Sequence, residues 1–108
     1  MNQETVHIAN LLKEVELPAS GINSRPIFHN DRLRVTLFGL SPDDAMTEHS
    51  TTMEAIVQVL QGEGTMTLGG ESKPLQVGTW VHMPPGLPHS ILPSTPMVFL
   101  LTLLKPQA

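Results

Sequence analysis

The sequence predicts an all-β protein, built as an antiparallel β-sandwich or a jelly-roll barrel. Its apolar runs are about four to eight residues long, which is the length of strands rather than of helices. Ten prolines and eight glycines among 108 residues interrupt these runs and imply many turns. The runs recur about every 8–12 residues, a spacing typical of sandwiches and barrels of roughly seven to nine strands.

A chain of 108 residues forms one domain with one core. We expect the barrel core at about 25–104, preceded by an N-terminal arm at 1–24. In the arm, the following apolar residues would share one face of a short helix that ends before Pro18: Val6, Ile8, Leu11, Leu12 and Val15. So short a helix is not stable alone, and it must therefore dock on the barrel.

Strand signals follow from Arg25 onward. Pro26-Ile27-Phe28 leads into a turn, and the next run alternates, with Leu33, Val35 and Leu37 on one face and Arg34, Thr36 and Phe38 on the other. The clearest strand is 55–60, which is rich in β-branched residues. Thr65–Leu68 alternates polar and apolar side chains, Gly69-Gly70 makes a tight hairpin turn, and Leu75-Gln76-Val77 is the next short strand.

The closing run, 97–104, is apolar at nearly every position. A strand of this kind should be buried on both faces. A small barrel covers only the inward face well, so we expect a homodimer that buries part of the other face.

Composition excludes several classes of function. The net charge of −4 and the scattered six basic residues give no footprint for nucleic acid. The chain has no cysteine, which excludes disulfides, thiolate metal sites and cysteine nucleophiles. No apolar run approaches about 18 residues, and the N-terminus lacks the layout of a signal peptide. We therefore expect a cytoplasmic protein with no membrane partner.

The segment 78–89 predicts a rigid turn that carries a histidine onto a strand. Pro84, Pro85 and Pro88 each fix their own φ angle and restrict the preceding residue. His89 follows at the start of the next apolar run. A binding side chain held in this way needs little ordering when its ligand arrives.

This segment resembles the second sequence motif of the cupins, the RmlC-like family of small jelly-roll barrels. Gly78, Pro84, Gly86 and His89 match the motif in spacing, whereas Pro93 stands where the family has asparagine.

The first cupin motif is present only in part. Counting back from Gly62, His49 takes the place of the first histidine, but Thr51 and Ala55 replace the second histidine and the glutamate. The resemblance covers about residues 33–104.

The resemblance implies a metal site, because complete cupins hold a divalent ion with three ligands from the first motif and one histidine from the second. Of these four ligands, only His49 and His89 are present in this sequence. The resemblance therefore implies that they bind Zn, Ni, Cu, Mn or Fe weakly, or that they bind no metal. The expected pocket wall consists of Thr51, Met53, Ala55, Val57 and Met83, to which Phe38 and Phe99 are possible additions. For each apolar member, plain core packing is the simpler interpretation.

Glu54 and His82 are the two further residues that we consider as candidate metal ligands. Glu54 precedes Ala55 and therefore faces the other side of a regular strand, unless a bulge before Val57 turns it inward. His82 faces outward if Val81 and Met83 line the barrel.

Two functions remain open at this point. One is a metal-dependent enzyme, such as an oxygenase, isomerase or lyase, that acts on a small organic substrate. The alternative is a non-catalytic small-molecule-binding protein without a stably bound metal.

Overall fold

The computed structural model describes residues 4–106 and confirms the all-β fold, with nine strands and a single 3₁₀ turn. The strands are β1 (Ile22–His29), β2 (Leu33–Leu40), β3 (Met46–His49), β4 (Glu54–Gln61), β5 (Gly64–Leu68), β6 (Glu71–Leu75), β7 (Trp80–Met83), β8 (His89–Pro93) and β9 (Met97–Leu104). Within the described residues, no helix is long and apolar enough to cross a membrane.

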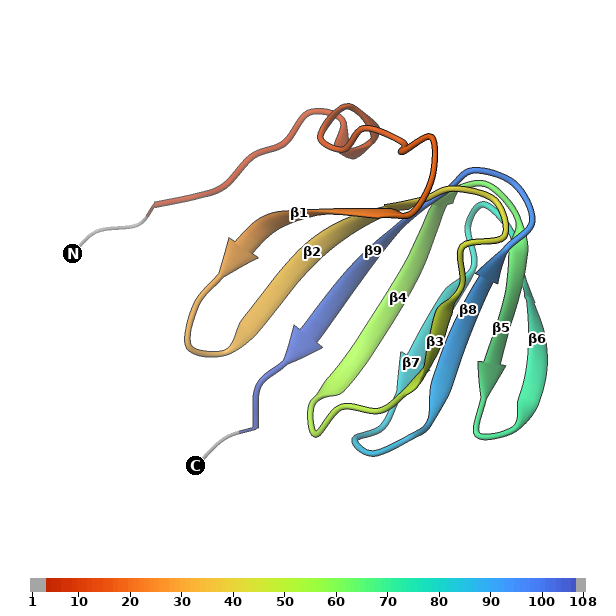
Figure 1. Cartoon of the computed structure of the whole chain (residues 1–108). Helices are drawn as coiled ribbons and strands as arrows, with labels where there is room; N and C mark the ends of the chain where they lie inside the picture. The colour runs from red at the N-terminus through yellow and green to blue at the C-terminus, as the bar shows by residue number, and fades with distance from the viewer. Residues whose placement is uncertain (1–3, 107–108) are drawn as a thin grey trace.

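The strands form two antiparallel sheets that face each other as a jelly roll (Figure 1). The large sheet has the order β1-β2-β9-β4-β7, and the small sheet has the order β3-β8-β5-β6. The last strand of the chain therefore lies in the middle of the large sheet, hydrogen-bonded to β2 on one side and to β4 on the other.

The core lies between the two sheets. Met97 and Phe99 of β9 point into it, and the Phe99 ring stacks on that of Phe38 with the centroids 5.1 Å apart. The expected alternation of β2 is confirmed, because Phe38 packs on the core while Leu37 is buried on the opposite face. We call this opposite face of the large sheet its outer face.

The N-terminal arm docks on the outer face, but the predicted helix is reduced to one 3₁₀ turn, Leu11–Lys13. The Asn10 side chain caps this turn by accepting a hydrogen bond from the Leu12 amide at 3.1 Å. The segment is too short to sustain an α-helix, and its contacts with the sheet favour an irregular path. A methyl group on Gly39 would lie 3.3 Å from the Glu16 carbonyl oxygen, so the arm crosses β2 at this glycine.

The prediction of a strand at 75–77 was wrong in position. The hairpin turn at Gly69-Gly70, where both φ angles are positive, places Leu68 opposite Glu71, so the strand starts immediately after the turn. Gln76 and Val77 belong instead to the next turn, in which the Gln76 amide donates to the Thr79 hydroxyl at 3.0 Å.

Candidate functional site

His49 and His89 meet at one end of the barrel. His49 ends β3 and His89 begins β8, and the two residues are directly opposite in the antiparallel register. Their Nε2 atoms lie 3.1 Å apart, and their rings meet edge to face. His89 is 7% exposed, whereas His49 is open to solvent. Strand pairing thus brings together two imidazoles that are forty residues apart in the sequence.

Main-chain carbonyl groups determine which nitrogen of each ring carries a proton. The Nδ1 atom of His49 lies 2.8 Å from the Thr47 oxygen, and that of His89 lies 2.9 Å from the Leu87 oxygen. A carbonyl oxygen can only accept, so each Nδ1 must donate, and each Nε2 of a neutral ring then presents a lone pair. Two lone pairs at this distance repel each other unless a proton or a metal ion lies between them.

The separation of the two Nε2 atoms suits a metal ion. Imidazole nitrogens bind Zn²⁺ at about 2.0–2.1 Å, so two Nε2 atoms 3.1 Å apart could both hold one such ion. The carbonyl groups behind both rings also provide the outer hydrogen bonds that usually orient metal-binding histidines.

The described part of the chain supplies no third protein ligand near the histidine pair. Among residues 4–106, no three His, Cys, Asp or Glu side chains are grouped so as to hold a metal ion. Ala55 is fully buried at the position where the resemblance would place a carboxylate.

Glu54 and His82 lie on the exposed side of the strands, where the Nε2 atom of His82 is 2.7 Å from a carboxylate oxygen of Glu54, within hydrogen-bond distance. The register of β4 shifts after Val59, too late to turn Glu54 inward, so neither residue joins the histidine pair.

The expected pocket residues fall into two groups. Ala55, Val57 and Met83 are fully buried in the core. Met53 and Thr51 are half-buried in the loop before β4, where the Thr51 hydroxyl accepts a hydrogen bond from the Met53 amide at 3.2 Å. The barrel interior near the histidines is therefore packed with side chains, and the site lies at the mouth of the barrel.

Two backbone hydrogen bonds hold the proline-rich turn, residues 84–88, to the segments on either side of it. The Gly86 amide donates to the Thr51 carbonyl at 2.8 Å, and the Gly69 amide donates to the Pro88 carbonyl at the same distance. These bonds hold the backbone that leads into β8 from both sides. They therefore fix the position of His89, the first residue of β8.

Comparison with protein families identifies the chain. A family model described as a cupin domain matches residues 36–103. The chain belongs to the cupin family. No curated protein matches this cupin significantly.

Solved structures of similar proteins agree with this family and fold. The cupin is 28% identical to SPY1581 of Streptococcus pyogenes, a conserved protein of unknown function, over 100% of this chain and 95% of that one, with a TM-score of 0.86. A cupin superfamily protein of Desulfitobacterium hafniense has 17% identity over 98% and 100% of the two chains and a TM-score of 0.86. KdgF from a Halomonas species has 17% identity, coverage of 96% and 90%, and a TM-score of 0.76.

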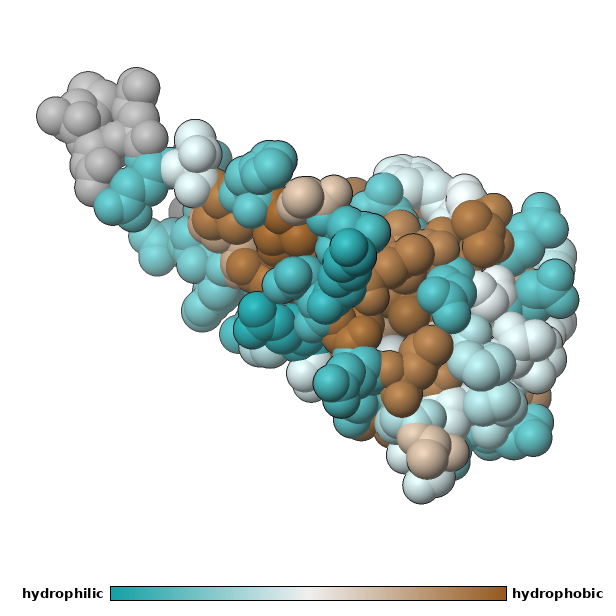
Figure 2. All heavy atoms as spheres, turned by 90° about the horizontal axis from the view of Figure 1, so that it is seen from above, coloured by the Kyte–Doolittle hydropathy of each residue, from teal (hydrophilic) through white to brown (hydrophobic). Residues whose placement is uncertain are grey.

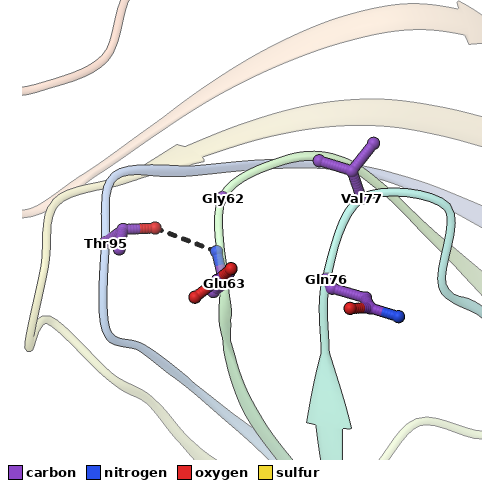
Figure 3. A pocket seen from close by; sticks show the side chains of 5 residues that line it. All are labelled: Gly62, Glu63, Gln76, Val77 and Thr95. Carbon is purple, nitrogen blue, oxygen red and sulfur yellow. Dashed lines mark hydrogen bonds between the residues drawn. The ribbon is translucent and has the colours of Figure 1, made fainter.

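The opposite end of this cupin barrel carries a separate polar pocket of about 430 Å³ (Figure 3). The lining residues come from three loops and are Gly62, Glu63, Gln76, Val77 and Thr95. The Glu63 amide donates to the Thr95 hydroxyl at 2.9 Å, the interaction drawn in the figure. Glu63 is its one titratable lining residue, so this pocket offers no acid–base pair. No sequence motif pointed to it.

Asp44 accepts two hydrogen bonds beside the start of β1. The Ser41 hydroxyl and, at 2.8 Å, the Gly21 amide both donate to its Oδ2 atom. These bonds, that from Ser41 above all, lower the pKa of Asp44 below its ordinary value. Asp44 therefore ties the end of the arm to the loop between β2 and β3.

Proposed function

We propose that this cupin binds a divalent transition-metal ion between His49 and His89 and, through it, a small organic ligand with oxygen donors. The observation that carries the proposal is that the Nε2 atoms of the two rings lie 3.1 Å apart, while the Nδ1 atom of each ring is held by a backbone carbonyl oxygen. Such a pair is preorganised for a cation, because neither ring must turn or change its tautomer to bind.

The donor set favours some metals over others. Two imidazoles without a carboxylate suit Cu²⁺, Ni²⁺ and Zn²⁺ better than Mn²⁺ or Fe²⁺. Two protein ligands leave several coordination positions for water and for the organic ligand. When bound, the metal would supply Lewis acidity that polarises an oxygen of that ligand. The Thr51 hydroxyl, which already accepts from Met53, keeps its own proton free to donate to a ligand at the mouth.

A metal-free binding protein is the second candidate, and the lack of a third ligand among the residues that the structure describes favours it. In this form the two imidazoles recognise a small carboxylic acid or another oxygen-rich compound by hydrogen bonds at the barrel mouth. The same residues would then recognise the ligand without catalysis.

Metal titration distinguishes the two candidates. Chelator-treated protein is titrated with Ni²⁺, Cu²⁺ or Zn²⁺ while calorimetry follows binding and thermal unfolding follows stability. A hundredfold excess over Kd stabilises a protein by about 2.7 kcal/mol, which raises the Tm of so small a domain by roughly 10 °C or more. We expect this gain in the wild-type protein, and its loss in His49→Ala and in His89→Ala.

His82→Ala is the matched control, because it removes a histidine from the outside of the barrel and leaves the pair intact. A gain that persists in His89→Ala but disappears in His82→Ala would place the metal elsewhere. If no metal binds and small carboxylates stabilise the protein through His89, the metal-free candidate is correct. If neither class of ligand stabilises it, both candidates fail.

A further inference from the structure

The polar pocket at the end of the barrel opposite the histidine pair has a volume of about 430 Å³, which is enough for a small molecule. The loops that line it, β4–β5, β6–β7 and β8–β9, lie at the top of the barrel in Figure 1. Figure 2 views the molecule from above and shows mostly polar and intermediate side chains over the part of the barrel farthest from the arm. These surroundings favour a polar ligand.

The backbone of Glu63 is held firmly within this pocket. Its amide donates to the Thr95 hydroxyl at 2.9 Å. Its carbonyl oxygen accepts from the Ser94 amide at 2.9 Å, from the Ser94 hydroxyl at 3.1 Å and from the Thr95 amide at 3.3 Å. All of these bonds come from the β8–β9 loop, so two loops that are far apart in the sequence form one rigid unit around Glu63.

The glycines on either side of Glu63 permit this close packing. A methyl group on Gly62 would collide with the Pro96 carbonyl oxygen, and one on Gly64 would collide with the Leu92 carbonyl oxygen. A side chain at either position would therefore displace the neighbouring backbone. Glu63 is the one residue of the segment 62–64 that presents a side chain to the pocket, and its backbone needs no ordering when a ligand arrives.

The carboxylate of Glu63 has no hydrogen-bond or ion-pair partner in the part of the chain that the structure describes. No lysine or arginine is among the described residues that line the pocket. Lys73, the one basic residue in the strands of the small sheet, pairs instead with Glu71 at 3.4 Å. A negative charge on a fixed backbone is thus left without a counter-charge, and it attracts a cation.

The residues around this carboxylate narrow the class of cation. One carboxylate supplies too few oxygen ligands for a divalent metal ion, whereas its two oxygens match the paired N–H donors of a guanidinium group. Figure 3 shows Glu63 between Thr95 on one side and Gln76 on the other, with Val77 above Gln76. Val77 is 66% exposed, so its side chain can cover the aliphatic stem of a ligand.

We propose that this pocket is a second binding site of the cupin, which takes a small organic cation that carries a guanidinium group on an aliphatic stem. The Glu63 carboxylate accepts two hydrogen bonds from the guanidinium group, and Val77 packs against the stem. The histidine pair lies at the other end of the barrel and takes no part. The protein therefore binds this cation whether or not a metal ion is present.

Titration of the full chain with n-butylguanidine, followed by two-dimensional amide NMR, tests the proposal. We expect saturable shifts of the amide signals of Glu63, Val77 and Thr95. n-Butylurea has nearly the same shape but no charge, and it should cause no saturable shifts. Glu63→Gln should weaken the binding of butylguanidine about tenfold or more, because hydrogen bonds to charged groups are stronger than those between neutral groups.

Glu48→Gln is the matched control, since it removes the same charge from an exposed residue of β3 at the histidine end of the barrel. It should bind butylguanidine as tightly as the wild-type protein does. Val77→Lys places a cation beside the carboxylate at an exposed position, and it should abolish binding without unfolding the protein.

Three results would overturn the proposal: no saturable shifts in the wild-type protein, equal binding of butylurea, or equal affinity of Glu63→Gln and Glu48→Gln. A tripeptide with a central arginine should bind no more tightly than butylguanidine, and tighter binding would overturn the assignment to a free small molecule. Metal titration reports on the histidine pair separately, so failure of one proposal leaves the other standing.

Discussion

Each imidazole of the histidine pair is oriented by the carbonyl group of the residue two positions earlier in the sequence. Side chains commonly provide such orienting bonds around binding sites, but here the backbone does so. The two Nε2 atoms are therefore positioned by the pairing of β3 with β8 and by the fastened proline-rich turn. This explains how a site with two protein ligands retains a defined geometry.

The hydrogen bonds of Asp44 predict how the stability of the folded protein depends on pH. Its pKa is lowered in the folded state, so its bonds stabilise the protein above the unfolded pKa of about 3.9 and are lost as the pH falls through the folded value. Asp44→Asn should be less stable than wild type at pH 7. The difference should shrink as the pH is lowered below about 4, and urea unfolding at several pH values measures it.

Asp43→Asn is the control for this experiment. Asp43 has a positive φ of 68°, a conformation that asparagine tolerates as well as aspartate does. We expect little change in stability from this variant. An equal loss in both variants would show that the loop responds to its net charge and not to the bonds of Asp44.

Among the elements, the loop between β4 and β5 depends most closely on a glycine. Gly62 has a φ of 91°, and a methyl group there would lie 2.2 Å from the Pro96 carbonyl oxygen. The loop between β8 and β9 thus passes too close for any side chain. Gly62→Ala should destabilise the protein by about 3 kcal/mol or more, as backbone strain combines with a steric clash.

Gly70→Ala separates the two causes. Gly70 has nearly the same φ, 88°, but a methyl group there would meet nothing within 4 Å. We expect a loss of about 1–2 kcal/mol, the cost of the left-handed conformation alone. Chemical unfolding of both variants measures the difference, and equal losses would mean that the neighbouring loop gives way.

Over the whole molecule, the position of β9 should limit the rate of folding. β9 pairs with both β2 and β4, so the large sheet is complete only after residues 97–104 have joined strands that lie far earlier in the sequence. Folds dominated by such distant pairings fold in milliseconds to seconds. Stopped-flow circular dichroism should show this rate, and complete folding within microseconds would contradict it.

The sequence predicts much of the fold, but it predicts little of the geometry of the site. Apolar runs, period-two patterns and glycine turns sufficed to predict strands such as β2, β4, β5 and β9, because these patterns follow directly from burial. The approach of His49 to His89 was accessible only through the family resemblance, since no local rule links residues forty positions apart.

Details that depend on tertiary contacts were not predictable. The strand expected at 75–77 was displaced because the Gly69-Gly70 turn determines the pairing register. The arm forms only the 3₁₀ turn Leu11–Lys13, because so short a segment gains too little from helical hydrogen bonds to hold an α-helix. The pocket beside Glu63 is assembled from three loops, and no short stretch of sequence describes it.

The carbonyl groups behind the two imidazoles have a consequence for how this protein tolerates mutation. Thr47 and Leu87 contribute main-chain oxygens, so replacing their side chains leaves the orienting bonds in place. A substitution at Thr47 or Leu87 that keeps the backbone path therefore leaves the proton pattern of the site unchanged, although Leu87 also packs against the core.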